Sequence, residues 1–241
     1  MRFPMALGVL GLLLPAVGCN DTTTSVGTRP GMVENDGDGG GVSLYVSSDD
    51  THSVLAYNGK SGAFQRTFAR GGGLIEPEGI TFGPDGNLYV SSRSNAVLRY
   101  DGKTGEFIDV FAVGHGLMDP AGIVFGGPDN DLFVSSGLTD EGQGNQILRF
   151  DGRTGAFKAV VDPANKAGLD DPEALTFGSD GLLYVASTPE EGPGEVLRYN
   201  PVNNQFVDKF IPKTRARSWT RPACSSALTG TCSSAARRRA R

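Results

Sequence analysis

A segment of five residues recurs four times along the chain, and its spacing constrains the fold more than any other feature of the sequence. Leu44-Tyr45-Val46-Ser47-Ser48 returns with small changes at 88–92, at 132–136 and at 183–187. The first residues of these segments are 44, 44 and 51 positions apart. A repeat of this length is typical of propellers and solenoids, in which each repeat is one packing unit.

Each repeat is expected to form four short strands. The clearest one begins with a strand that ends at the turn Gly83-Pro84-Asp85-Gly86, where proline presets φ and glycine accepts a positive φ. Apolar alternation marks the second and third strands of the repeat. Its expected strands are 79–82, 87–92, 96–100 and 106–112. Four short strands per unit predict an all-β fold built from propeller blades, not a helical repeat.

The repeat divides 42–212 into a partial blade and three complete ones. Their expected bounds are 42–75, 76–118, 119–168 and 169–212. The first unit lacks its first strand in this division, so the fold class is an incomplete β-propeller of about three and a half blades, an open arc. Such an arc leaves apolar faces uncovered at its ends, and we expect Leu44, Val46, Leu183 and Val185 to lie on them.

The N-terminus has the pattern of an export signal. Arg2 precedes the apolar run 5–14, which is too short to span a bilayer and ends in small residues. Residues 1–18 are therefore expected to be a signal peptide. Ala16-Val17-Gly18-Cys19 resembles a bacterial lipoprotein signal, which implies cleavage before Cys19 and a lipid on its sulfur. Ordinary secretion is the alternative. The protein would then be exported and either lipid-anchored in the cell envelope or secreted.

Residues 19–41 read as a disordered linker between the signal and the blades. The segment is rich in Thr, Gly and Asp and shows no apolar periodicity. Such a composition cannot bury enough surface to offset the entropy of ordering it.

The last residues, 213–241, depart from the blade pattern and form a basic tail. They hold eight of the 22 basic residues and no acidic residue, so the rest of the chain carries 14 basic against 27 acidic residues. Read from the third base of each codon, 218–232 can encode another blade opening, similar to 169–178. We therefore expect the tail to be out of frame. A basic disordered tail is the alternative.

The segment from Pro77 to Val90 resembles the NHL-repeat class of propellers. It is also similar to streptogramin-lyase-like and gluconolactonase-like propellers, and the resemblance covers about Val42 to Pro212. It implies a fold that usually closes with six blades. The residues that carry it are turns and strand cores, so it implies little about function.

Two carboxylates and two histidines are the candidates for chemistry. Glu78 and Glu173 occupy equivalent places before their first strands, where the third unit has Ala121. The functional interpretation is a general base or a ligand of a divalent cation such as Ca or Mg, and the gluconolactonase-like resemblance implies a glutamate at a similar entry. Local capping of backbone N–H groups is the alternative. Streptogramin-lyase-like enzymes need a channel histidine, for which His52 and His115 are the candidates; exposed loop histidines are the alternative.

Two enlarged connections, 137–146 and 188–195, are the expected binding loops. Their candidate residues are Gly137, Thr139, Asp140, Glu141, Gln143, Asn145, Glu190 and Glu191. The leading interpretation is a cell-envelope binding or scaffold module that needs no cofactor and recognises an envelope protein or glycan. A lyase or lactone hydrolase with a divalent metal in the central channel is the alternative. The acidic body does not favour nucleic-acid binding, and membrane contact would come through the lipid anchor alone.

Overall fold

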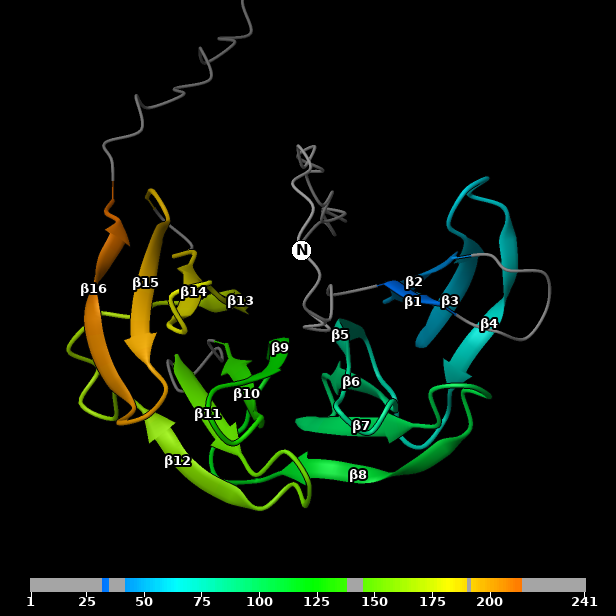
Figure 1. Ribbon diagram of the computed structural model, residues 1–241, viewed down its shortest axis with the longest axis horizontal. Coiled ribbons are helices and arrows are strands. Elements are labelled where there is room, and N and C mark those ends of the chain that lie inside the picture. Colours follow the sequence, from blue (N-terminus) through cyan, green and yellow to red (C-terminus); the bar gives the residue numbers. More distant parts are fainter. Residues whose placement is uncertain (1–31, 35–41, 138–144, 190–191, 214–241) are drawn as a thin grey trace, which may run out of the picture.

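The computed structural model describes residues 32–34, 42–137, 145–189 and 192–213. In these segments the chain forms four antiparallel sheets of four strands, and each sheet joins its strands in chain order. The sheets stand side by side as blades around an open arc (Figure 1). The predicted fold class, an incomplete all-β propeller, is confirmed. No helix in the described segments is long and apolar enough to cross a membrane.

The strands are short, as the turn-rich sequence predicts, and the four blades use them in groups of four. Their bounds are, for blade 1, β1 (Met32–Glu34), β2 (Val42–Ser48), β3 (Ser53–Asn58) and β4 (Phe64–Arg70); for blade 2, β5 (Pro77–Phe82), β6 (Leu88–Ser92), β7 (Ala96–Tyr100) and β8 (Phe107–Val113); for blade 3, β9 (Pro120–Gly126), β10 (Asp131–Ser136), β11 (Gln146–Phe150) and β12 (Phe157–Val161); and for blade 4, β13 (Pro172–Phe177), β14 (Leu183–Ser187), β15 (Glu195–Asn200) and β16 (Gln205–Ile211).

The first blade contains an innermost strand, β1, although the blade bounds expected from the sequence left this strand out. β1 pairs antiparallel with β2, with Met32 opposite Leu44 and Glu34 opposite Val42. The expectation of a three-stranded first unit is therefore wrong, and three residues of the expected linker belong to the sheet. A strand of three residues is too short to show periodicity, and its pairing uses backbone groups that any residue offers. Residues 1–31, 35–41 and 214–241, with Cys19, lie outside the described residues.

The apolar core lies between blades. Tyr45 of blade 1 packs edge-to-face against Phe68 of its own blade and Phe82 of blade 2, with ring centroids 4.7 and 5.3 Å apart. Tyr89 repeats this contact at the next junction, with Phe111 of blade 2 and Phe125 of blade 3 at 4.8 and 4.7 Å. Each junction therefore buries one apolar cluster, and the three clusters hold the arc together.

The two ends of the arc expose different faces, and one expectation about them is wrong. Leu44 and Val46 are 45% and 38% exposed, as expected of an uncovered first blade. Leu183 and Val185 are fully buried, because they face blade 3. The open face of blade 4 is the opposite one, where Phe210 is 52% exposed.

Candidate functional site

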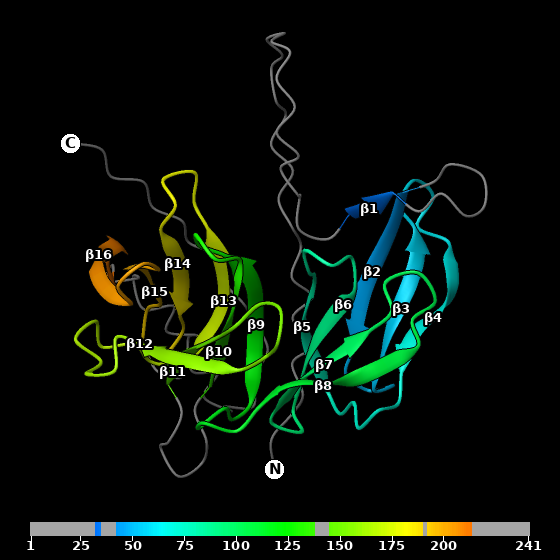
Figure 2. The same cartoon turned by 60° about the horizontal axis from the view of Figure 1, so that its bottom comes forward.

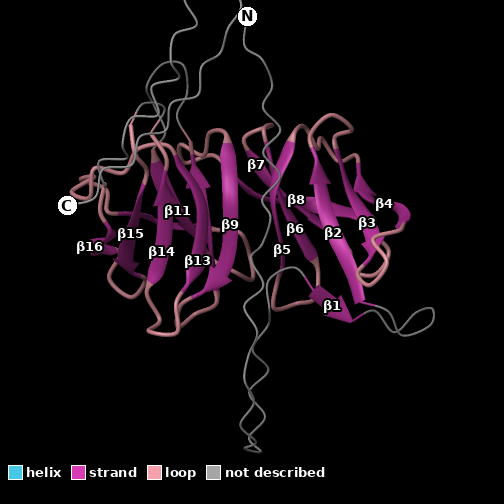
Figure 3. Cartoon of the chain, turned by 90° about the horizontal axis from the view of Figure 1, so that it is seen from above, coloured by secondary structure: helices cyan, strands magenta, loops and turns pink. Residues whose placement is uncertain are grey.

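The innermost strands β5, β9 and β13 line the concave side of the arc (Figure 1). They place Glu78 and Glu173 at equivalent positions, with Ala121 of the intervening blade between them, as the repeat alignment predicts. Both glutamates are exposed. The strands run between two rims on which the connections gather, as the side view shows (Figure 3).

The pKa of Glu78 is raised to about 7. The largest cause is partial removal of the carboxyl group from water, even though its surface remains exposed on the concave side. The carboxylate of Asp119 raises the pKa further, the guanidinium of Arg93 opposes the shift, and Glu173 and Asp49 add smaller increases. The Glu173 carboxylate is therefore close enough to contribute to the raised pKa of Glu78.

The nearby cation is already engaged by other carboxylates. Nη1 of Arg93 donates to Glu76 at 2.6 Å, and its Nε donates to Asp119 at 2.8 Å. Among the described residues, no group of three or more His, Cys, Asp and Glu side chains is arranged to hold a metal ion. The described part of the concave side thus offers a glutamate with a shifted pKa but no cluster of three metal-binding side chains.

His52 has a local role that two asparagines repeat in the following blades. Each of the three residues precedes the third strand of its blade, has a positive φ, and accepts the N–H of the residue just before the next blade's first strand. The pairs are His52 Nδ1 with Glu76 at 3.0 Å, Asn95 Oδ1 with Asp119 at 3.0 Å, and Asn145 Oδ1 with Asp171 at 2.8 Å. This contact accounts for His52 as a junction residue.

His115 lies on the connection from blade 2 to blade 3. Its ring stacks on Phe157 of blade 3, with centroids 4.2 Å apart and planes 4° from parallel. The two histidines therefore have separate partners in different blades. The structure gives each of them a packing or junction contact.

The described ends of the enlarged connections contact the entrance of blade 4. Asn145, at the end of 137–145, donates to Asp170 at 3.1 Å. Thr188, at the start of 188–194, donates through its N–H and its hydroxyl to the carbonyl of Asp171, at 3.1 and 2.9 Å. Gly137 donates to the carbonyl of Asp119 at 3.2 Å. The other candidates, Thr139, Asp140, Glu141, Gln143, Glu190 and Glu191, lie outside the described residues.

A third connection, 162–168, is also enlarged and was not predicted from the sequence. Seven residues separate Val161 from Leu169, whereas four separate the equivalent pairs Ala69–Leu74 and Ala112–Leu117. The interval between these apolar anchors was the signal that could have revealed it. The two enlarged connections expected from the sequence were 137–146 and 188–195.

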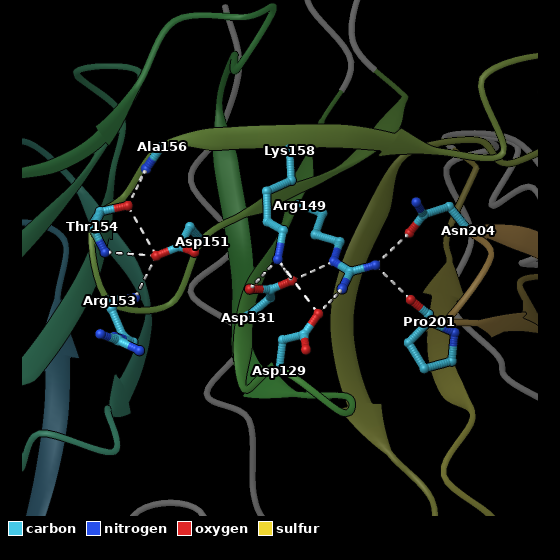
Figure 4. A network of polar contacts seen from close by, with 10 residues as sticks. All are labelled: Asp129, Asp131, Arg149, Asp151, Arg153, Thr154, Ala156, Lys158, Pro201 and Asn204. Atoms are coloured by element: carbon cyan, nitrogen blue, oxygen red, sulfur yellow. Dashed lines mark hydrogen bonds and ion pairs between the residues drawn. The ribbon is translucent and has the colours of Figure 1, made fainter.

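A charge network centred on the buried side chains of Arg149 and Asp131 ties blade 3 to blade 4 (Figure 4). The Arg149 guanidinium donates to Asp131 at 2.5 Å and to the carbonyl of Pro201 in blade 4 at 2.6 Å. Asp131, whose side chain is 1% exposed, also pairs with Lys158 at 2.9 Å. Because each charge has an opposite partner, the network is a structural link rather than a site for a ligand.

One sequence family matches part of the chain. The model of the strictosidine synthase-like N-terminal family matches residues 66–100, from the fourth strand of blade 1 to the third strand of blade 2. No curated protein matches this chain in sequence.

Solved structures match most of the chain at low sequence identity. Hydrazine synthase of Kuenenia stuttgartiensis matches with a TM-score of 0.56 and 19% identity over 71% of this chain and 46% of its own. A catalytically inactive virginiamycin B lyase from Staphylococcus aureus, with quinupristin, matches with a TM-score of 0.52 and 17% identity over 80% and 58%. The extracellular domain of a hybrid two-component system from B. thetaiotaomicron matches with 0.50 and 13% over 72% and 21%.

The chain therefore spans less than two thirds of the length of each of these structures. Sequence identities below 20% show a shared fold but do not show a shared activity. The strand order, the inter-blade cores and these structural matches together identify the chain as a β-propeller with an incomplete ring of blades.

Proposed function

We propose that this chain is an exported binding module, anchored in the cell envelope by a lipid on Cys19, whose ligand-binding surface is the rim at blades 3 and 4. The observation that carries the proposal is that the described ends of all three enlarged connections lie there. The connections are 137–145, 162–168 and 188–194, and hydrogen bonds at Asp170 and Asp171 join two of them to the entrance of blade 4.

The repeat itself explains why these connections share one rim. Successive antiparallel strands alternate in direction, so the connection between the second and third strands leaves on the same side as the connection to the next blade. Binding residues are concentrated on connections that a rigid scaffold positions. Enlargement confined to one rim and one junction therefore favours a localised binding surface over a uniform scaffold.

A loop graft tests this proposal. Replacing 137–145 by Arg93-Ser94-Asn95, the equivalent connection of blade 2, removes the enlargement and retains an asparagine where Asn145 lies. We expect the graft to fold and to lose capture of a component from detergent-solubilised cell envelope. Protease and periodate treatment of the extract then distinguish a protein from a glycan.

A substitution pair on the opposite rim serves as the control. Lys103→Ala and Arg153→Ala change the hairpin turns between the third and fourth strands of blades 2 and 3. We expect these variants to capture as the parent chain does. Capture that survives the graft unchanged would show that the enlarged connection is not the binding surface.

A second candidate function, a lyase or lactone hydrolase, is favoured by one observation. A carboxyl group with a pKa of about 7 is suited to general-base chemistry near neutral pH, and Glu78 has such a pKa on the concave side. The fold of the chain is also similar to that of a lyase, the virginiamycin B lyase, which supports this candidate. A divalent metal bound by Glu78 and Glu173 would complete this candidate.

Calorimetric titration with Ca²⁺ and Mg²⁺ separates the two functions. Saturable binding that both Glu78→Ala and Glu173→Ala abolish would support the enzyme. The absence of binding in the parent chain would exclude the metal site and leave the binding module.

A further inference from the structure

The open face of blade 4 repeats the face with which blade 2 packs against blade 3. In blade 2, the rings of Tyr89 and Phe111 meet edge-to-face, with centroids 4.8 Å apart and planes at 82°. In blade 4, the rings of Tyr184 and Phe210 do the same at 5.1 Å and 82°. In both blades an arginine guanidinium lies 5.1 Å from the centroid of the phenylalanine ring. We call this surface the leading face of a blade.

The charges on the two leading faces are paired in the same way. Arg99 of blade 2 donates through Nε and Nη2 to Asp109, at 3.1 and 2.6 Å. Arg198 of blade 4 donates through the same two groups to Asp208, at 2.8 and 2.6 Å. Because each guanidinium has a carboxylate partner on its own blade, another apolar blade can cover the face without leaving a charge unpaired.

The two leading faces differ in what covers them. Tyr89 and Phe111 are 1% and 6% exposed, because blade 3 packs on them. Phe210 and Ile211 are 52% and 49% exposed, because no other described blade lies against blade 4 on this side. Blade 4 therefore presents one assembled half of a blade junction.

The other half of a junction is free on blade 1. At the junction of blades 2 and 3, the second and third strands of blade 3 cover the leading face with apolar side chains only: Leu132, Val134, Leu148 and Phe150. The equivalent residues of blade 1 are Leu44, Val46, Leu55 and Tyr57. Leu132 and Val134 are fully buried, whereas Leu44 and Val46 are 45% and 38% exposed. We call this apolar surface the trailing face of a blade.

We propose that the leading face of blade 4 packs against the trailing face of blade 1 in a second copy of this chain. The two faces lie at opposite ends of the arc, so each copy carries one of each (Figure 1). Charge selects this pairing, because two leading faces would bring two Arg198 guanidinium groups together, whereas the trailing face has no charged side chain among these four residues.

Two copies that make this contact reciprocally would close a ring. Four blades from each copy give eight, which is within the range of about four to eight blades usual in propellers. A head-to-tail contact that closes in this way leaves no free face on which a filament could grow.

Apolar side chains supply most of the proposed contact. Ser91 and Ser135 each donate to a carbonyl of the following blade, and Ala186 of blade 4 cannot make this bond. We therefore expect the contact between copies to be weaker than an internal junction and to depend on protein concentration. The inference is separate from the proposed binding function, whose surface is the rim and not these faces.

Sedimentation velocity of the full chain over a range of concentrations tests the proposal. We expect a monomer at low concentration and a pair at high concentration. Val46→Lys and Phe210→Lys should each raise the dissociation constant at least about tenfold, because each places an unpaired ammonium in an apolar contact. Val113→Lys is the matched control: Val113 is 58% exposed on β8 of blade 2, away from both faces, so this variant should pair as the parent does.

Mixing the two variants shows which faces meet. A Val46→Lys copy keeps its leading face, and a Phe210→Lys copy keeps its trailing face. An equimolar mixture should therefore form one-to-one pairs through a single intact contact, although neither variant pairs alone. Circular dichroism and Tm values equal to those of the parent would establish that both variants fold.

Three results would overturn the proposal. The first is a parent chain that stays monomeric at its highest soluble concentration. The second is a Val46→Lys or Phe210→Lys variant that pairs as strongly as the parent, since the contact would then use another surface. The third is a mixture that does not pair. Protection of the β16 amides from hydrogen exchange in a monomeric parent would assign the leading face of blade 4 to another segment of the same chain.

Discussion

The three junctions within the arc and the free edge of blade 4 are built from the same repeat but differ in the residues that join one blade to the next. At each internal junction a serine of the second strand donates to a carbonyl of the next blade's innermost strand. The bonds run from Ser47 to Glu78, from Ser91 to Ala121 and from Ser135 to Glu173, at 2.7, 2.6 and 2.7 Å. Blade 4 has Ala186 at this position and cannot make the bond.

Two further junction residues change in the same blade. Gly79 and Gly122 allow close approach of the innermost strands, since a Cβ on either would lie 2.3 Å from a carbonyl oxygen of the next blade. Blade 4 has Ala174 at this position, and it has Gly194 where the other blades have the junction residues His52, Asn95 and Asn145.

The junction residues that blade 4 lacks are those that would contact a following blade. Contacts within blade 4 are retained. The Ser187 hydroxyl accepts the N–H of Asp170 at 3.0 Å and donates to the carbonyl of Asp170 at 2.8 Å. Blade 4 therefore keeps the bonds within the blade and lacks those that would join another blade in the same geometry. The proposal that 213–241 encodes a further blade out of frame remains a prediction, and such a blade would need a different junction.

The largest expected effect compares equivalent valines on β6 of blade 2, which has a blade on either side, and on β2 of the end blade (Figure 2). Val90 is fully buried between blades 1 and 2, whereas Val46 is 38% exposed at the free face of blade 1. Val90→Lys should prevent folding, because an unpaired buried ammonium costs more than about 4 kcal/mol. Val46→Lys should change stability by about 0.5 kcal/mol or less. It should also reduce self-association in sedimentation experiments. Cooperative thermal unfolding of Val90→Lys would show that this junction is not formed.

The next comparison concerns the close approach of the innermost strands. Gly122→Ala should destabilise the chain by about 1–3 kcal/mol, because the added methyl meets a backbone oxygen that cannot move aside freely. Ala174→Gly, at the equivalent position of blade 4, should cost only about 0.5–1 kcal/mol through the entropy of glycine. Urea denaturation midpoints measure both, and equal losses would mean that the junction geometry is not specific.

The hydrogen bond from the second-strand serine to the next blade can be tested with two opposite substitutions. Ser135→Ala removes the donor to Glu173 and the acceptor of the Gly122 N–H, and should cost about 1–3 kcal/mol. Ala186→Ser adds a hydroxyl at the free edge and should have an effect of about 0.5 kcal/mol or less. If Ala186→Ser were strongly stabilising in the present chain, something other than solvent would have to face this edge.

The smallest expected effect is a pH dependence at the first junction. The folded-state pKa of Glu78, about 7, lies above its unfolded value, so its contribution favours folding below about pH 4.5 and is lost as the pH rises towards 7. Glu78→Gln should remove this decline. NMR titration should give a midpoint near 7, and Arg93→Gln should move it upward by removing the opposing charge. A midpoint near the ordinary value of glutamate would contradict the described surroundings.

The amino-acid sequence determined the repeat, the strand order and the turns. Apolar alternation and residues such as Pro84 and Gly86 act over a few positions, so their consequences are readable locally. The equivalence of Glu78 and Glu173 and the enlargement of 137–146 followed from the same alignment. The short strand β1 did not, because its pairing is made by backbone groups alone.

The tertiary structure alone decided which equivalent residues are covered and which polar groups are paired. Leu44 and Leu183 begin the same motif, yet one is 45% exposed and the other fully buried. Both faces of a blade are apolar, and a local pattern cannot state on which side a neighbour stands. The bond between His52 and Glu76 depends likewise on where the connection to the next blade runs.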